Sequence, residues 1–147
     1  MRNLILVALM IILTPGCAYR LQAVPYGVDE MSPYDKRVVN EALTTLPTCQ
    51  RWTWTNDQLG RSYTIRTVVG YQDDINKQCK IFSLDTVYAV GSSRRKNKRV
   101  VERACKQSYD THWILEPTDD LFGFKVGSDL RYYTPNNVDS HCASGRR

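Results

Sequence analysis

The chain opens with an apolar run whose length is typical of a signal peptide. Met1-Arg2-Asn3 is short and basic, and Leu4–Leu13 contains ten consecutive apolar residues. Ten residues span about 15 Å as a helix, roughly half the hydrocarbon core of a bilayer, which is too short for a transmembrane helix. We therefore predict that residues 1–16 are a signal peptide and that the rest of the chain is exported.

Two kinds of cleavage fit the end of this run. Gly16-Cys17 is typical of a bacterial lipoprotein signal, in which Cys17 becomes the first mature residue and carries acyl chains. Thr14 stands where such signals usually have an aliphatic residue, and Gly16 with Ala18 also suits ordinary cleavage after Ala18, which would discard Cys17. We favour lipidation of Cys17. Because no aspartate follows Cys17, we expect a periplasm-facing protein anchored in the outer membrane.

The apolar spacing becomes helical after a stretch without periodicity. Residues 17–31 show no regular pattern and predict a lipidated tether. Ser32 can then cap a helix that has Pro33 in its first turn, and Pro47 ends this helix. Its apolar stripe is predicted to comprise Tyr34, Val38, Val39, Ala42, Leu43 and Leu46. Its solvent-facing side is predicted to comprise Asp35, Lys36, Asn40, Glu41 and Thr44.

From Gln50 the apolar period is two, which predicts β-strands separated by turns at residues 56–60 and at Asp73-Asp74. The first predicted strand contains Trp52 and Trp54, and the second has Tyr63, Ile65, Thr67, Val69 and Tyr71 on one face. The next three predicted strands are Cys79–Val90, Val100–Lys106 and His112–Leu115. Further candidates, as edge strands, are Leu121–Phe124 and Leu130–Tyr133. Because the connecting loops are short, neighbouring strands are expected to be antiparallel.

These elements predict an α+β fold, with one N-terminal helix packed on an antiparallel sheet of four to five strands. About 130 residues follow the signal peptide, enough for one domain, which we place at residues 32–147 with a C-terminal extension. Trp54 and Trp113 are predicted to lie in its core and not on a ligand-binding face.

The cysteine count indicates disulfides. Apart from Cys17 the cysteines number four, and an even number in an exported domain predicts two disulfides with three possible connectivities. Metal binding is the alternative, but the chain has no C-x-x-C spacing and its two histidines lie apart, so we expect no metal or other cofactor. Cys79 opens one predicted strand and Cys105 closes the next, so a hairpin centred near Ser92 would place them opposite each other. Cys49 and Cys142 are then expected to form the second pair.

Arg94–Arg99 is the most strongly charged segment, and its cations are Arg94, Arg95, Lys96, Lys98 and Arg99. It is predicted to lie at a hairpin tip after Gly91-Ser92-Ser93. One interpretation is a solvated tip whose charge discourages pairing between edge strands. The other is a docking patch for anionic lipid headgroups, lipopolysaccharide, peptidoglycan carboxylates or an acidic protein. Nucleic acid is not an expected partner, because 20 Lys and Arg exceed 15 Asp and Glu only mildly and the chain is predicted to be exported.

Residues suited to catalysis are few and scattered, so we predict that the protein is not an enzyme. His141 lies beside Ser140 and near Asp139, but residues of these types meet by chance in a polar tail. The acidic doublets Asp73-Asp74 and Asp119-Asp120 are typical of solvated turns.

Short motifs occur in a fixed order over Ser32–Leu115. They are a helix with Asp35, Ala42 and Leu43, then Trp54-x-Asn56-x-x-x-Gly60, Tyr63, Cys79-Lys80-x-Phe82, Ala104-Cys105-Lys106 and Trp113. The ordered set resembles the seventeen-kilodalton surface antigen type of bacterial outer-membrane lipoprotein. This resemblance implies a periplasm-facing lipoprotein domain without catalytic residues, and it also pairs Cys79 with Cys105. The chain lacks that family's glycine-rich, zipper-like segment, has Lys80 and Lys106 in place of arginines, and carries Cys142 in an extra tail.

The predicted function is therefore a non-catalytic outer-membrane lipoprotein that serves as an envelope structural or interaction module. An accessory of a secretion or conjugation assembly is one form that such a module takes. The alternative is a periplasmic binding or inhibitor module. We expect the membrane, through the N-terminal lipid, and envelope proteins as its partners.

Overall fold

The computed structural model describes residues 27–28, 31–90, 94–116, 124–126 and 131–144. The predicted signal peptide and Cys17 lie outside these residues, as does the predicted tether except for Gly27, Val28 and Met31. No helix within the described ranges is long and apolar enough to cross a membrane.

The first helix, α1 (Pro33–Thr45), begins and ends where the sequence predicts. Ser32 Oγ accepts a hydrogen bond from the backbone N–H of Asp35 at 3.1 Å, and Pro33 occupies the first turn. Two positions differ from the prediction, because Tyr34 is 50% exposed and Asp35 is completely buried. The buried side of the helix carries Val39, Ala42 and Leu43, as predicted.

Five strands form one antiparallel sheet in the order β1-β2-β3-β4-β5. They are β1 (Arg51–Asn56), β2 (Arg61–Gln72), β3 (Gln78–Val90), β4 (Arg94–Lys106) and β5 (Ile114–Glu116). Each strand pairs with its neighbours in the sequence, which confirms the predicted antiparallel sheet. Between β2 and β3, Asp73 Oδ1 accepts hydrogen bonds from the backbone N–H groups of Ile75 (3.1 Å) and Lys77 (2.7 Å), so this carboxylate shapes the predicted turn.

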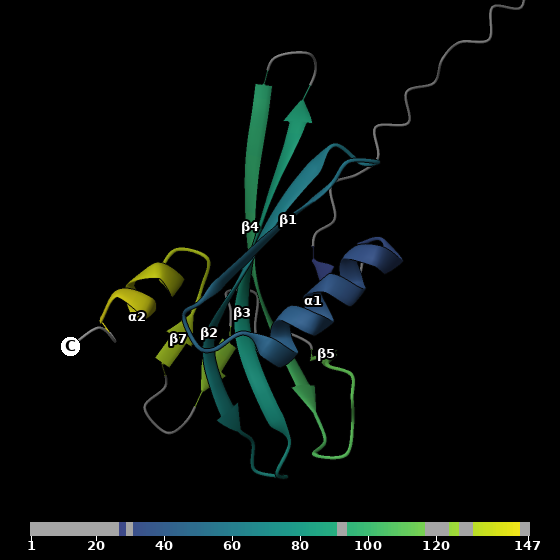
Figure 1. Cartoon of the computed structure of the whole chain (residues 1–147). Helices are drawn as coiled ribbons and strands as arrows, with labels where there is room; N and C mark the ends of the chain where they lie inside the picture. Colours follow the sequence, from purple (N-terminus) through teal and green to yellow (C-terminus); the bar gives the residue numbers. More distant parts are fainter. Residues whose placement is uncertain (1–26, 29–30, 91–93, 117–123, 127–130, 145–147) are drawn as a thin grey trace, which may run out of the picture.

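The sheet separates two groups of buried side chains. Successive residues of a strand point to opposite faces, so the neighbours Ile81 and Phe82 belong to different clusters. Figure 1 shows α1 and a second helix, α2 (Val138–Ser144), on either side of the strands. The cluster beneath α1 includes Val39, Leu43, Trp54, Tyr63, Ile65, Phe82 and Leu84. The opposite cluster comprises Val68, Ile81, Val101, Tyr133, Val138 and Cys142.

The C-terminal region differs from the prediction of a single helix and added edge strands. The strands β6 (Phe124–Val126) and β7 (Arg131–Tyr133) pair with each other in a separate two-stranded sheet. Helix α2 has 7 residues, which is too short to display a helical apolar stripe, and burial of Val138 and Cys142 holds it in place. The remaining residues of the predicted edge strands, 121–123 and 130, lie outside the described ranges, as does Asp119-Asp120.

A bulge changes the buried face of β2. The sequence predicts that the alternating apolar residues of this strand share one face. The register of pairing with β3 shifts between Thr67 and Val69, which is the signature of a β-bulge. Tyr63 and Ile65 therefore belong to the cluster beneath α1, whereas Val69 and Tyr71 pack against the opposite cluster.

The basic run forms the first part of strand β4, a strand that the sequence predicts to begin only at Val100. β4 begins at Arg94 and pairs with β3 along its whole length, from Val90↔Arg94 to Gln78↔Lys106. A strand forms despite the charges because the facing residues of β3 favour β-structure: Thr86, Val87 and Tyr88. The last strand also differs slightly, since β5 begins at Ile114 and not at His112.

Two disulfides join the predicted pairs of cysteines. Cys79 and Cys105 are direct cross-strand partners in β3 and β4, with Cα atoms 4.1 Å apart. Cys49 and Cys142 have Cα atoms 5.3 Å apart and link the segment before β1 to α2. The domain is therefore held together at the centre of the sheet and again across its second face.

The chain enters the domain beside β4. The backbone N–H of Val28 donates to both carboxylate oxygens of Glu102, at 3.2 and 3.1 Å. Val28 and Met31 are buried in the cluster beneath α1. Val28 and Met31 therefore pack with the domain core, although they precede the boundary predicted at residue 32.

Candidate functional site

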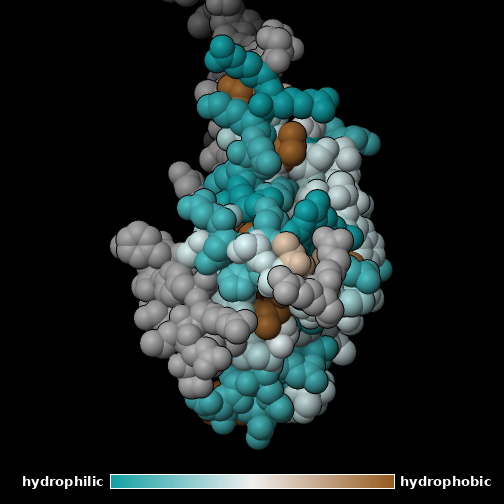
Figure 2. Space-filling model, turned by 90° about the vertical axis from the view of Figure 1, so that its left-hand side faces the viewer, coloured by the Kyte–Doolittle hydropathy of each residue, from teal (hydrophilic) through white to brown (hydrophobic). Residues whose placement is uncertain are grey.

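The distal part of the β3–β4 hairpin forms a basic ribbon, which we define as Thr86–Val90 with Arg94–Arg99. β2 reaches only to Arg61, which pairs with Tyr88. β5 pairs only with Arg103–Cys105 of β4, so β3 is the only described strand beside the earlier part of β4. Figure 1 shows these two strands extending past both helices, and Figure 2 shows hydrophilic residues gathered at this end of the molecule.

The cations of the basic ribbon divide between the two faces of β4. Alternation places Arg94, Lys96 and Lys98 on one face, and Arg95 and Arg99 on the other. Arg94, Arg95 and Lys96 are exposed, and none of the three forms an ion pair with another described residue. The accessible charge therefore lies on both faces of the strand.

Arg99 belongs to an internal charge network. Its guanidinium donates to both oxygens of Asp85 (2.6 and 2.9 Å) and to Asp139 Oδ2 (2.7 Å). These hydrogen bonds, that with Asp85 foremost, raise the pKa of Arg99 above its usual range. Asp139 also pairs with Arg66, so the network ties α2 to β2, β3 and β4. Arg99 is therefore a structural cation, unlike the exposed members of the ribbon.

Trp113 lies between two lysines at the end of α1. Lys80 Nζ and Lys106 Nζ lie 5.5 and 4.9 Å from the centre of the indole ring. Burial, together with the nearby charge of Lys106, lowers the pKa of Lys80. The same ammonium donates to the carbonyl oxygens of Leu43 (2.6 Å) and Leu46 (3.0 Å), and so caps the C-terminal end of the helix. These lysines therefore have a structural role.

Two polar residues of α1 also hold Trp113: Thr44 is exposed, as the sequence predicts, and Asn40 is partly buried. The backbone N–H of Trp113 donates to Asn40 Oδ1 at 2.9 Å, and its indole Nε1–H donates to Thr44 Oγ1 at 3.1 Å. Trp113 is only partly buried, and it packs against the edge of the core. Its predicted place in the core is therefore correct only in part.

Asp35 is the centre of a buried hydrogen-bond network that the sequence analysis missed. One carboxylate oxygen accepts from Trp54 Nε1 at 2.9 Å. The other accepts from Asn56 Nδ2 at 2.9 Å and from Ser32 Oγ at 2.6 Å. The network joins the start of α1 to β1. An available signal was the combination of an N-cap serine with an acidic residue three positions later, which is typical of a helix start.

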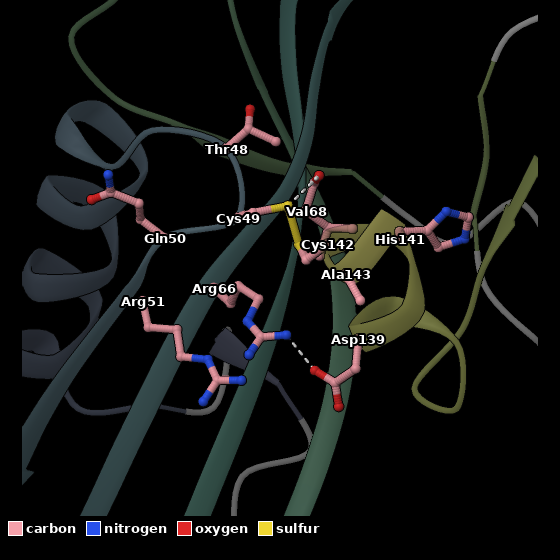
Figure 3. Close-up of a pocket in the computed structure, with 10 residues that line it drawn as sticks. All are labelled: Thr48, Cys49, Gln50, Arg51, Arg66, Val68, Asp139, His141, Cys142 and Ala143. Carbon is pink, nitrogen blue, oxygen red and sulfur yellow. Dashed lines mark hydrogen bonds and ion pairs between the residues drawn. A yellow bond between two sulfur atoms is a disulfide. The ribbon is translucent and has the colours of Figure 1, made fainter. Parts of the chain in front are cut away.

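A groove lies between β1, β2 and α2, on the sheet face opposite α1, and has a volume of about 880 Å³. Figure 3 shows Arg51 and Arg66 pointing into this groove, opposite Asp139 and below the Cys49–Cys142 disulfide. Arg51 and Arg66 are direct cross-strand partners. The sequence analysis did not single out this pair, although counting back from the Asn56–Gly60 turn would have placed the two arginines opposite each other.

No family profile, curated protein or solved structure matches this chain. The resemblance to the surface antigen family therefore stays a prediction that rests on the motifs. In the structure, residues of these motifs attach α1 to the sheet at both ends of the helix. Asp35, Trp54 and Asn56 form one buried network, and Lys80, Lys106 and Trp113 form one cluster at the other end of α1.

Ser140, His141 and Asp139 contact separate partners. Ser140 Oγ donates to the carbonyl oxygen of Asn137 at 2.7 Å, whereas the ring of His141 stacks on Tyr133 with centroids 4.4 Å apart. Asp139 binds two arginines instead of the histidine. The geometry is therefore not that of a nucleophile, a base and an orienting acid. Within the described residues, no three His, Cys, Asp or Glu side chains are grouped to hold a metal ion.

Proposed function

We propose that this protein is a non-catalytic lipoprotein of the bacterial outer membrane that faces the periplasm and acts as an envelope interaction module. In this proposal the basic ribbon docks on an acidic envelope protein. A component of a secretion or conjugation assembly is the kind of partner that we expect. The observation that carries the proposal is the projecting ribbon, in which Arg94, Arg95 and Lys96 are exposed without an ion pair to a described residue.

Two properties of the ribbon favour a protein partner. Exposed cations attract an acidic surface over several ångströms and raise the rate of association. In addition, the outer edge of β4 from Arg94 to Asn97 faces no other described strand, so a strand of a partner can add to it through backbone hydrogen bonds. A lipid surface supplies anionic charge but no such strand. The combination therefore favours an acidic protein segment.

Replacing Arg94 and Lys96 by glutamine is expected to weaken partner binding at least about tenfold, because charge-assisted contacts contribute roughly 1.5–3 kcal/mol each. The melting temperature should hardly change, since exposed charges contribute about 0–1 kcal/mol to stability. A photo-crosslinking residue at the exposed Ala89, used in intact cells and followed by mass spectrometry, measures the loss.

The matched control for this experiment replaces Lys36 and Arg37, two exposed cations of α1, by glutamine. This variant loses the same charge and should crosslink like the wild type. Crosslinking of the wild type should fall with added salt, because exposed charges are screened beyond about 8 Å at physiological ionic strength. Crosslinks that survive both the Arg94 and Lys96 substitutions and high salt would contradict the proposal, and crosslinks to lipid alone would replace the protein partner with a membrane.

Lipidation of Cys17 is the second expected result. Labelling cells with a clickable palmitate analogue should mark the wild-type protein and not Cys17→Ser, because the thioether to the lipid requires the cysteine sulfur. The Cys17→Ser protein should accumulate as an unlabelled precursor. Equal labelling of the two proteins would contradict lipidation of Cys17, and a mature N-terminus at Tyr19 would show ordinary cleavage after Ala18.

The second candidate function is a periplasmic binding or inhibitor module, and the groove at Arg51 and Arg66 favours it. Co-purification separates the two functions. An assembly accessory should be recovered in a large membrane complex, whereas a binding or inhibitor module should be recovered with one soluble partner in fixed stoichiometry.

A further inference from the structure

The groove between β1, β2 and α2 contains an arginine pair with unbalanced charge. Arg51 and Arg66 are direct cross-strand partners, and both line the groove. Figure 3 shows their guanidinium groups pointing into the same space, opposite the carboxylate of Asp139. Like charges that face each other across neighbouring strands destabilise a sheet. An anion between the two guanidinium groups would remove this repulsion.

The described carboxylates beside the groove do not balance these arginines. Asp139 accepts from Arg66 with one oxygen and from Arg99 with the other. Asp85 already holds Arg99 through both of its oxygens. Arg51 has no hydrogen bond or ion pair with a described residue. The two aspartates therefore bind only Arg66 and Arg99, and the excess positive charge lies at Arg51, at the open side of the groove.

We infer that this groove binds the oxyanion group, a carboxylate or a phosphate, of a small ligand, with Arg51 and Arg66 as the binding residues. A guanidinium has five N–H donors arranged as a planar fork that matches both groups. Arg66 uses Nη1 for Asp139, which leaves its other N–H groups for a ligand. Arg51 supplies a second fork from the neighbouring strand.

The surroundings support a ligand larger than a single inorganic ion. A volume of about 880 Å³ is within the range of sites that hold small organic molecules, roughly 300–1,000 Å³. Val68 and Ala143 add apolar residues to the lining, whereas Figure 3 shows the side chains of Thr48 and Gln50 directed away from the two arginines. His141 points away from the two arginines in Figure 3, and it stacks on Tyr133 instead. Recognition of charge therefore rests on the arginines.

Titration of the oxidised, full mature chain at constant ionic strength tests this inference, with amide NMR shifts as the readout. The two probes are inorganic phosphate and succinate, and the tighter of the two identifies the class of oxyanion. We expect saturable shifts at the amides of Arg51, Arg66 and Ala143. Arg51→Gln should weaken binding about tenfold, because it removes a charge-assisted hydrogen bond and leaves no internal partner unsatisfied.

A second variant is expected to raise the affinity for the oxyanion. Asp139 competes with the ligand for Arg66, so Asp139→Asn should tighten oxyanion binding, by about tenfold. The Cys49–Cys142 disulfide keeps α2 attached in this variant. Arg37→Gln, which removes an exposed arginine of α1 on the other side of the sheet, should bind like the wild type.

The results of these titrations either support or contradict the proposed oxyanion site. Weaker binding in Arg51→Gln together with tighter binding in Asp139→Asn supports the site. Shifts that do not saturate, or that are equal in Arg51→Gln and Arg37→Gln, would show a general effect of salt and overturn it. Because Arg94, Arg95 and Lys96, the exposed cations proposed to dock the partner, are unchanged in all of these variants, loss of the oxyanion site and loss of partner docking are distinguishable.

Discussion

Replacing Asp35 by alanine is expected to lower the free energy of unfolding by about 3–5 kcal/mol. The carboxylate is fully buried and accepts hydrogen bonds from Ser32, Trp54 and Asn56. Alanine would leave the indole N–H of Trp54 and the amide of Asn56 without an acceptor, and each buried donor left unpaired costs about 1–3 kcal/mol. Equilibrium unfolding of the oxidised protein in urea measures the change.

Two further variants complete this measurement. Asp57→Ala removes an exposed carboxylate from the turn after β1 and should change stability by less than about 0.5 kcal/mol. Asp35→Asn keeps one acceptor oxygen of similar shape and should therefore cost less than Asp35→Ala. If Asp35→Ala were as harmless as Asp57→Ala, the buried network would not be the reason why α1 is attached to β1.

Removing the Cys79–Cys105 disulfide by replacing both cysteines with alanine is expected to lower the stability of the whole sheet by about 3–4 kcal/mol. The bond has a sequence separation of 26, and closing a loop of this length restricts the unfolded chain by about that amount on chain-entropy grounds. It joins β3 to β4 in the middle of the five-stranded sheet, so all strands share the loss. Urea unfolding of the double variant measures it.

Removing the Cys49–Cys142 disulfide is expected to have a local effect instead. Its sequence separation of 93 would predict an even larger entropic contribution, about 4.6 kcal/mol. However, α2 contributes only Val138 and Cys142 to the buried cluster, so it can detach while the sheet stays folded. Hydrogen exchange should show loss of protection in α2 and unchanged protection in β3. Equal loss in both elements would contradict this local account.

The sheet could be predicted because turn residues and alternation agree along the chain. The side chain of Asp73 accepts backbone hydrogen bonds within the turn that it begins, and apolar and polar residues alternate along most of the strands on either side of it. Register followed from the same features, as the direct pairing of Cys79 with Cys105 shows. The bulge at Val68 could not be predicted, because an extra residue in a strand leaves no distinct mark in the pattern of apolar residues.

The features that could not be predicted from the sequence depend on contacts between segments that are distant along the chain. Asp35 looked like a solvent-facing residue of a helix start, and only the approach of β1 makes it a buried acceptor. Arg99 looked like one more cation of a charged run, but Asp85 lies directly opposite it on β3. Helix α2 carries few helix-favouring residues and is held by the disulfide of Cys142. Composition and periodicity do not contain such information.

The order of the disulfides along the chain has a consequence for oxidative folding. The two bonds are nested, because Cys79–Cys105 lies wholly inside the loop that Cys49–Cys142 closes. When a chain crosses a membrane N-terminus first, Cys49 and Cys79 reach the oxidising side before either native partner arrives. An oxidase that joins cysteines in order of arrival would therefore produce a bond that must later be exchanged. Such a protein is expected to be a client of disulfide isomerases and not of oxidases alone.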